Sequence, residues 1–211
     1  MSQTINTQHQ AVPEKYHEEI LVVPREQLFA NETLTWHGVN TSEEITTHTL
    51  ETINKHQSYI PRYQAEENAA FKQIIPYMIF EYNGTYFVMQ RKKDASETRL
   101  ANKYSLGIGG HMRKEDLAQG ATIFDWAKRE FEEEVTFAGN IHIKPLGILN
   151  DDTNDVGKVH LGLVLFIHAD NGNITIKDEH KSGVLLTLEE CIALMPSMES
   201  WSQLVLQKLA E

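Results

Sequence analysis

The sequence predicts an α/β (α+β) fold in which helices pack on a mixed β-sheet. The first indication is that short apolar runs with strand character and segments with helical periodicity follow one another along the chain. The second is the dipeptide Asn83-Gly84, which separates two of these apolar runs and is the strongest short signal for a β-hairpin. With 41% hydrophobic and 23% charged residues, the 211-residue chain has the composition of a globular protein that buries a core.

Residues 1–70 are expected to form an N-terminal extension with a strand and a helix. The apolar run 20–23, closed by Pro24, predicts a short buried strand. Thr41 and Glu44 have the spacing of a capping box, which predicts the start of a helix. The first dozen residues are polar and are expected to be frayed. The extension could complete a substrate pocket, add a dimer interface or form a small subdomain.

Residues 71–211 are expected to form the main domain. Apolar runs rich in β-branched and aromatic residues predict strands at 74–80, 85–89, 103–108, 141–149, 159–169 and 174–176. Helical periodicity predicts helices at 121–136, 188–194 and 199–209. These elements together predict a mixed sheet that helices cover.

The formal net charge of −11 argues against a protein whose main partner is a nucleic-acid backbone. No apolar run approaches the roughly 18 residues that a membrane-spanning helix needs. The N-terminal residues lack the basic and apolar segments of a secretory signal. The single cysteine, Cys191, excludes an internal disulfide and fits a reducing compartment. We therefore expect a cytoplasmic protein that binds neither nucleic acid nor a membrane.

A basic segment interrupts this acidic chain between residues 91 and 114. It contains seven basic and two acidic residues, a local balance of +5. Charge clusters of this kind are more often a solvated loop surface than a binding site. This segment, however, includes Gly109-Gly110 near its end, and an acidic helix is expected to follow it. Its position favours a role in holding phosphate oxygens.

Residues 129–135 give the strongest chemical signal in the sequence. On a helix, at about 100° per residue, Glu130 and Glu134 lie one turn apart, Glu133 lies beside them, and Glu132 points elsewhere. Three converging carboxylates repel one another unless a cation neutralises them. Hard divalent ions with oxygen ligands, Mg²⁺ or Mn²⁺, are the natural partners of such a group.

The competing interpretation is an ordinary solvated acidic helix face. Two features count against it. The carboxylates lie near the C-terminal end of the helix, where negative charge opposes the helix dipole. They also follow the glycine turn and the basic segment, which together can cradle phosphate. The same helix is expected to bury on the sheet an apolar stripe formed by Phe124, Ala127, Phe131 and Val135.

These residues resemble the Nudix box, whose pattern is G-x5-E-x7-R-E-U-x-E-E-x-G-U with U apolar. Residues 129–137 match its second half at each defined position except the glycine, where this chain has Thr136. Gly110 corresponds to the opening glycine and Asp116 to the first glutamate. Twelve residues separate Asp116 from Arg129 where the pattern has seven, which implies a five-residue insertion or a first carboxylate from elsewhere.

The resemblance implies a Nudix-like fold, with a mixed sheet sandwiched by helices, and it implies roles for particular residues. The metal ligands would be Glu130, Glu133 and Glu134, and the ion would be Mg²⁺ or Mn²⁺. Arg129 would hold a ligand carboxylate in place. The catalytic residues would be Glu133, Arg129 and His160.

The general base is left open, because it varies in this family. His160 and the loop aspartates Asp151, Asp152 and Asp155 are candidates, since they would sit on the strand–loop–strand that follows the box. The alternative for the histidine is a hydrogen-bonded structural position. The alternative for the aspartates is a turn, where Asp and Asn bond the backbone.

The substrate-binding candidates are Arg91, Arg99, Gly110 and His111. The two arginines could clamp phosphate oxygens bidentately, with surface solvation as the alternative. Gly110 would permit the turn between loop and helix. His111 would either contact phosphate or cap that turn.

The Nudix family hydrolyses a nucleoside diphosphate linked to another group. The resemblance therefore implies a metal-dependent pyrophosphatase or phosphoesterase that cleaves a phosphoanhydride bond in a small-molecule diphosphate, with a homodimer as one form of assembly. The alternative is a non-catalytic nucleotide sensor of the same fold, favoured by the insertion, Asp116 and Thr136. An isoprenoid diphosphate isomerase, related in fold, is disfavoured because the only cysteine lies far downstream of the box.

Overall fold

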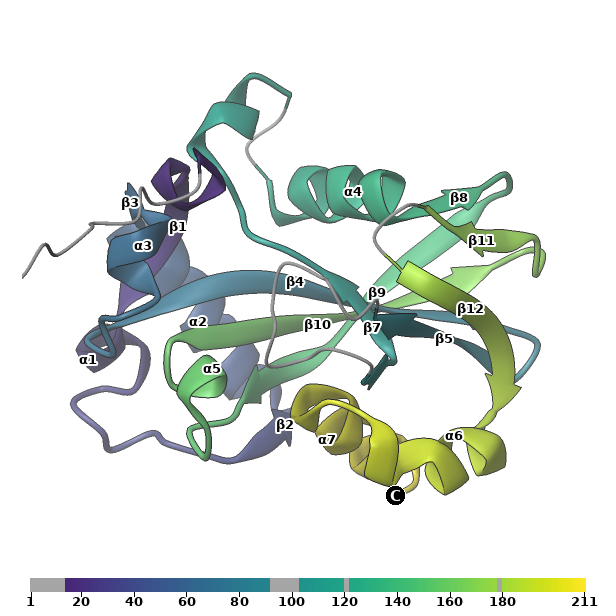
Figure 1. Ribbon diagram of the computed structural model, residues 1–211. Coiled ribbons are helices and arrows are strands. Elements are labelled where there is room, and N and C mark those ends of the chain that lie inside the picture. Colours follow the sequence, from purple (N-terminus) through teal and green to yellow (C-terminus); the bar gives the residue numbers. More distant parts are fainter. Residues whose placement is uncertain (1–13, 92–102, 120–121, 178–179) are drawn as a thin grey trace, which may run out of the picture.

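The computed structural model describes residues 14–91, 103–119, 122–177 and 180–211, and its main feature is a mixed β-sheet with helices on both faces (Figure 1). The central strands run in the order β12-β5-β4-β10-β9-β2, and further strands pair along them. The strands of this sheet are β1 (Glu19–Pro24), β2 (Gly38–Asn40), β3 (Ser58–Pro61), β4 (Phe71–Tyr82), β5 (Thr85–Arg91), β6 (Tyr104–Ser105), β7 (Gly107–Gly109), β9 (Ile141–Asn150), β10 (His160–Ala169) and β12 (His180–Thr187). A separate pair is formed by β8 (Val135–Phe137) and β11 (Ile174–Ile176).

Helices cover the sheet from two sides: α4 lies on one face, and α6 and α7 lie on the other (Figure 1). The α-helices are α1 (Arg25–Leu28), α2 (Glu43–His56), α3 (Arg62–Ala65), α4 (Ile123–Glu134), α5 (Asp155–Lys158), α6 (Leu188–Leu194) and α7 (Ser200–Leu209). The short 3₁₀ helices are η1 (Glu14–His17), η3 (Lys114–Gln119) and η4 (Met195–Ser197). Within the described ranges, no helix has the length and apolar character needed to cross a membrane. The predicted α+β architecture is confirmed.

Strand β4 is the centre of the molecule, and its apolar sequence follows from burial on both faces. It pairs in parallel with β10 and antiparallel with β1, β5 and β7. Alternate residues point to opposite faces of a strand. Met78 and Phe80 therefore pack with Phe131 of α4, while Ile79 packs on the other face with Val205 and its neighbours of α7. A strand buried on both faces is a continuous apolar run, as this one is.

The hairpin predicted at Asn83-Gly84 is confirmed. Tyr82 pairs with Thr85 across a two-residue loop, so β4 continues directly into β5. Both loop residues have positive φ, 48° at Asn83 and 77° at Gly84. Asparagine and glycine tolerate that conformation, which matches the right-handed twist of the flanking strands.

Helix α4 begins where its capping residues place it. Thr122 accepts a hydrogen bond from Asp125 N, and the Asp125 side chain accepts one from Thr122 N, which is a reciprocal capping box. The predicted apolar stripe was wrong at its first position, because Phe124 is 49% exposed. Trp126 is buried instead, in a cluster with Leu21 and other residues of the N-terminal segment. That contact fixes the rotation of the first turn and leaves Phe124 facing outward.

Two further predictions differ from the structure, and one strand was missed. Helix α2 has Ser42 as its N-cap, with no side-chain hydrogen bond, so the capping box predicted from Thr41 was wrong. The strand predicted at 103–108 is divided into β6, which pairs with β5, and β7, which pairs with β4, because the chain moves from one partner to the other. Strand β12 was not predicted at all. The expectation for the first dozen residues lies outside the described ranges.

The N-terminal segment is joined to the rest of the chain through the sheet. Strand β1 pairs antiparallel with β3 and also with β4, where Val22 lies opposite Gln73. The backbone N–H of Leu21 donates to Met112 O over 2.8 Å. The division of the chain at residue 70 stays a prediction, but these contacts place β1 and α3 beside the loop that follows β7.

A buried ion pair fixes the loop between β9 and β10. Lys72 is fully buried, and its Nζ donates to Asp152 Oδ1 over 2.7 Å, to Gly157 O over 2.7 Å and to His160 O over 3.2 Å. Arg25 of α1 also donates to both Asp152 oxygens, each over 2.9 Å. Strand β4, the loop and the start of β10 are thereby held together by one ammonium group.

We predict that Asp152→Asn lowers the free energy of unfolding by about 3 kcal/mol, because removing one partner leaves the Lys72 charge buried without compensation. Urea denaturation at neutral pH, followed by circular dichroism, measures the change. Asp155→Asn is the matched control, since the Asp155 side chain is 85% exposed, and its effect should stay within about 0.5 kcal/mol. Equal stability of Asp152→Asn and wild type would show that the ion pair does not hold this loop.

Candidate functional site

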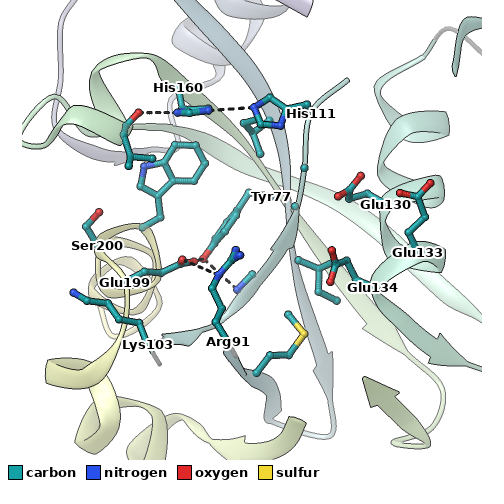
Figure 2. Close-up of a pocket in the computed structure, with 18 of the residues that line it drawn as sticks. Tyr77, Arg91, Lys103, His111, Glu130, Glu133, Glu134, His160, Glu199 and Ser200 are labelled. Atoms are coloured by element: carbon teal, nitrogen blue, oxygen red, sulfur yellow. Dashed lines mark hydrogen bonds and ion pairs between the residues drawn. The ribbon is translucent and has the colours of Figure 1, made fainter. Parts of the chain in front are cut away.

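A cavity of about 710 Å³ lies where the last turn of α4, strand β7 and the start of α7 meet (Figure 2). Three wall residues come from the N-terminal segment: Glu18, Arg62 and Glu66. Strand β7 pairs with β4 so that Gly109 lies opposite Tyr77. The Gly109-Gly110 loop is therefore set against the sheet and faces the carboxylate end of α4.

The structure brings three glutamates of α4 together on one wall of the cavity. Glu130, Glu133 and Glu134 all line it, and Figure 2 shows their carboxylates on the same side. Glu132 has a 64% exposed side chain and is not a wall residue. The helical spacing therefore places these side chains as the sequence suggested, and their role as ligands stays a prediction.

Arg129 joins this wall to the loop beneath it. Its guanidinium lies 2.9 Å from Asp116 Oδ2, 2.9 Å from Glu130 Oε2 and 2.7 Å from Glu133 Oε2, and it donates to His111 O over 3.0 Å. The side chain is only 10% exposed. A buried planar cation with several donors can hold several carboxylates at fixed angles. Arg129 thus fixes the direction of two of the three glutamates.

Asp116 does not line the cavity, although it shares Arg129 with Glu130 and Glu133. It is buried, and it accepts from Arg113 Nε over 3.0 Å in addition to its contact with Arg129. Arg113 reaches Glu133 Oε1 as well, over 3.3 Å. Asp116, which corresponds to the first glutamate of the Nudix box, therefore anchors two arginines in this chain.

Glu130 occupies the most crowded position of the group. Burial raises the pKa of its carboxyl to about 7, and repulsion from Glu134 and Glu133 acts in the same direction against the attraction of Arg129. A β-carbon at Gly110 would collide with the Glu130 carboxylate. Only glycine at this position leaves the carboxylate where it is.

Strand β12 adds a histidine that the sequence analysis missed. His180 is buried, lines the cavity, and has its Nδ1 3.1 Å from Glu134 Oε2. The two atoms lack the geometry of a hydrogen bond, and each is buried without another partner among the described residues. The local sequence gave no sign of this contact, because β12 reaches the site only through its pairing with β5.

A second group of polar side chains lies at another end of the cavity. His160 Nδ1 donates to Val156 O over 2.7 Å, and its Nε2 lies 3.3 Å from His111 Nε2. His111 Nε2 also lies 2.7 Å from Gln73 Oε1. Burial lowers the pKa of both imidazoles, so both are neutral at pH 7.

The part of the cavity lined by Tyr77, Arg91 and Glu199 contains a buried hydrogen-bond network. Glu199 Oε1 accepts from Tyr77 Oη over 3.0 Å and from Ser105 Oγ over 2.6 Å. Arg91 lies next to this network, with its Nε 3.8 Å from Glu199 Oε2. Burial, with the charge of Glu199, raises the pKa of Tyr77 well above its usual range. Sequence reasoning identified Arg91 but not Tyr77, Glu199 or the neighbouring Trp201, because nothing in their local sequence marks them.

The remaining candidates have different positions. Arg99 lies outside the described residues. Asp151 Oδ1 accepts from Thr153 N over 3.1 Å, and Asp152 holds Lys72, so neither is a wall residue of the cavity. Asp155 does line it. The turn interpretation therefore describes the contacts of Asp151, whereas Asp152 contacts the side chains of Lys72 and Arg25.

Comparison with known proteins identifies relatives of the whole chain. No protein-family model matches it. Protein YmaB of Bacillus subtilis (strain 168) is 34% identical over 203 residues, which cover 92% of this chain and 98% of the relative. The solved structure of Tm1382, a candidate Nudix hydrolase, is 28% identical with a TM-score of 0.75, and the match covers 91% of this chain and 98% of that one.

A more distant structure shares the fold of the main part of the chain. The MutT protein from Methanosarcina mazei Go1 is 14% identical with a TM-score of 0.50, and the match covers 66% of this chain and 93% of that one. The match to Tm1382 is longer and takes in part of the N-terminal segment. By its likeness to Tm1382 in sequence and fold over nearly the whole length of both chains, the chain belongs to the Nudix hydrolase family.

Proposed function

We propose that this protein is a Mg²⁺- or Mn²⁺-dependent hydrolase that cleaves a phosphoanhydride bond in a nucleoside diphosphate derivative or a related phosphorylated small molecule. The observation that supports this most is the placement of Glu130, Glu133 and Glu134 on one wall of a cavity that also has basic walls. Family membership supports the same class of reaction.

The residues present fit a hard divalent cation. Glu134 Oε2 is buried without a hydrogen-bond partner among the described residues, and burial raises the pKa of the Glu130 carboxyl to about 7 despite the contact with Arg129. All three donors are carboxylates, the ligand type that Mg²⁺ prefers. Glu130, Glu133 and Glu134 would hold the ion, which would supply neutralisation of the pyrophosphate and an attacking water of lowered pKa.

The other residues of the cavity have roles that follow from their positions. Arg129 orients the carboxylates of Glu130 and Glu133 and so fixes the geometry of the ligands. Arg91, Arg113 and Lys103 line the same cavity and can bind phosphate oxygens as charge-assisted donors. His160 stays a prediction as proton acceptor: its Nδ1 donates to Val156 O, so Nε2 carries the lone pair, which faces His111 Nε2 at 3.3 Å.

The N-terminal segment contributes to substrate choice in this proposal. Arg62 and Glu66 line the cavity from outside the box, and Arg62 Nε pairs with Glu66 Oε1 over 3.3 Å. A leaving group or base bound beyond the diphosphate would contact these side chains. Assembly as a homodimer stays a prediction.

One observation favours the alternative of a nucleotide sensor. Asp116, which corresponds to the first box glutamate, is engaged by Arg113 and Arg129 and does not line the cavity. A sensor would bind a nucleotide diphosphate and raise its own melting temperature without releasing product. Turnover assays separate this alternative from the hydrolase.

We predict metal-dependent product release from at least one member of a panel of nucleoside diphosphate derivatives. Glu133→Gln should lower kcat/KM by roughly 100-fold, because about 3 kcal/mol of transition-state stabilisation depends on the held cation. Glu132→Gln is the matched control on the same helix and should retain wild-type activity, since that side chain is exposed. Nucleotide-dependent stabilisation without turnover would replace the hydrolase by the sensor.

A second prediction concerns the glycine turn. Gly110→Ala should displace the Glu130 carboxylate, because the added β-carbon occupies its place. The expected result is a roughly tenfold higher Mg²⁺ concentration for half-maximal activity, which corresponds to about 1.4 kcal/mol. The melting temperature without metal should change little, since a flexible side chain absorbs the collision. An unchanged Mg²⁺ requirement would contradict the assignment of Glu130 as a ligand.

The raised pKa of Glu130 predicts a pH-dependent stability of the metal-free protein. The native carboxyl has a pKa of about 7, and an ordinary Glu has one of about 4.3. Between these values the native state binds the extra proton, so stability is full below pH 4 and falls as the pH rises through 7. Glu130→Gln should therefore stabilise the metal-free protein at pH 8, by up to about 4 kcal/mol, and have little effect at pH 4. Thermal melting in chelator at both pH values tests this.

A further inference from the structure

Three potential metal ligands from distant parts of the chain meet in the cavity, apart from the glutamates of α4. One ligand atom from each of Glu66, His111 and His160 lies within 4.8 Å of the others. Glu66 follows α3, His111 follows the glycine turn, and His160 begins β10. Figure 2 shows the two histidines at one end of the cavity and the three glutamates on another wall.

The two imidazoles have a separation that a metal ion can use. The Nε2 atoms of His111 and His160 lie 3.3 Å apart. Ligands at 2.0–2.1 Å from a tetrahedral ion are separated by about 3.3 Å. His160 Nδ1 must donate to the carbonyl of Val156, so the Nε2 lone pair of His160 points toward His111. A carbonyl acceptor on the opposite ring nitrogen is the usual arrangement behind a metal-bound histidine.

Contacts behind the three residues hold each of them in place. Gln73 is fully buried, and its Oε1 lies 2.7 Å from His111 Nε2. The backbone carbonyl of His160 accepts from buried Lys72, and Arg62 Nε pairs with Glu66 Oε1 over 3.3 Å. Contacts of this kind orient the side chains that hold a metal ion.

We propose that Glu66, His111 and His160 bind one divalent transition-metal ion of the Zn²⁺ type, at a site separate from the carboxylates of α4. Imidazole ligands favour Zn²⁺, Co²⁺ or Ni²⁺, whereas Mg²⁺ prefers oxygen. Three protein ligands leave one position of a tetrahedral ion open. All three residues line the cavity, so that position would accept an oxygen of a bound phosphate or a water. His160 would then hold an ion instead of accepting a proton.

The site goes beyond the hydrolase proposal, because it uses none of the α4 glutamates. It also gives the N-terminal segment a chemical function, since Glu66 supplies the one negative ligand. In the absence of an ion, His111 Nε2–H is expected to donate to Gln73 Oε1, 2.7 Å away, with the lone pair of His160 Nε2 as a second acceptor at 3.3 Å. Binding of the ion replaces that proton and shifts His111 to its other tautomer.

Direct metal binding to the full chain tests the proposal. Chelator-treated protein is titrated with Zn²⁺ in a large excess of Mg²⁺, which occupies oxygen sites without competing for imidazole. We expect one Zn²⁺ per chain by equilibrium dialysis and a higher melting temperature. Co²⁺ in place of Zn²⁺ should give the visible absorption of a nitrogen-ligated, four-coordinate ion.

Variants separate this site from the glutamates of α4. Glu66→Gln and His160→Ala should each weaken Zn²⁺ binding at least tenfold, since even residues behind a ligand typically contribute that much. His168→Ala is the matched control: it lies on the same strand but pairs with Glu81 over 2.8 Å, so binding should be unchanged. Glu133→Gln should also retain Zn²⁺. If His160→Ala does not fold, the partly exposed Glu66 gives the decisive variant.

Two results would overturn the proposal. The first is wild-type protein that binds no Zn²⁺ in the presence of Mg²⁺, in which case the two rings only hydrogen-bond to each other. The second is Zn²⁺ binding that is lost in Glu133→Gln and unaffected in Glu66→Gln, in which case the ion sits on α4. Neither result depends on whether the protein turns over a diphosphate, so failure of this proposal is distinguishable from failure of the hydrolase proposal.

Discussion

The guanidinium of Arg129 is the interaction on which the candidate site depends. Carboxylates crowded at the C-terminal end of a helix oppose both one another and the helix dipole. Arg129 compensates two of them, Glu130 and Glu133, and it ties them to Asp116 and to the backbone carbonyl of His111. A single buried side chain therefore sets the distance between the helix and the loop, and with it the shape of the cavity wall.

The opposite part of the cavity depends on a different cation. Buried Lys72 holds the loop after β9 and the carbonyl of His160, and the parallel pairing of β4 with β10 sets His160 opposite Gln73. These contacts bring His160 to His111, which the Arg129 contact fixes from the other side. Arg129 thus determines the position of the wall formed by α4, and Lys72 determines the position of the wall that carries His160. A protein held in this way presents its polar groups to a ligand with little reorganisation.

The sequence was informative where the signal is local. The Asn83-Gly84 hairpin, the strand 20–23 and the spacing of the α4 glutamates depend on backbone conformation and helical period, and the structure has all three. It was misleading at Phe124, where the period predicted burial and the packing of Trp126 against the N-terminal segment exposed the ring. No pattern in the sequence indicated β12. Its His180 lies beside Glu134 only because β12 pairs with β5.

The sequence alone determined the fold class, the family resemblance and the wall of three glutamates, because each follows from residue spacing within one continuous segment. Tertiary structure alone decided that Asp116 anchors arginines, that Asp152 neutralises buried Lys72, and that Glu66 meets two histidines. Asp152 and Lys72 lie many tens of positions apart in the chain, and so do Glu66 and the two histidines. A local sequence pattern cannot predict contacts of this kind, since they depend on the order of the strands and on which charged residues are buried together.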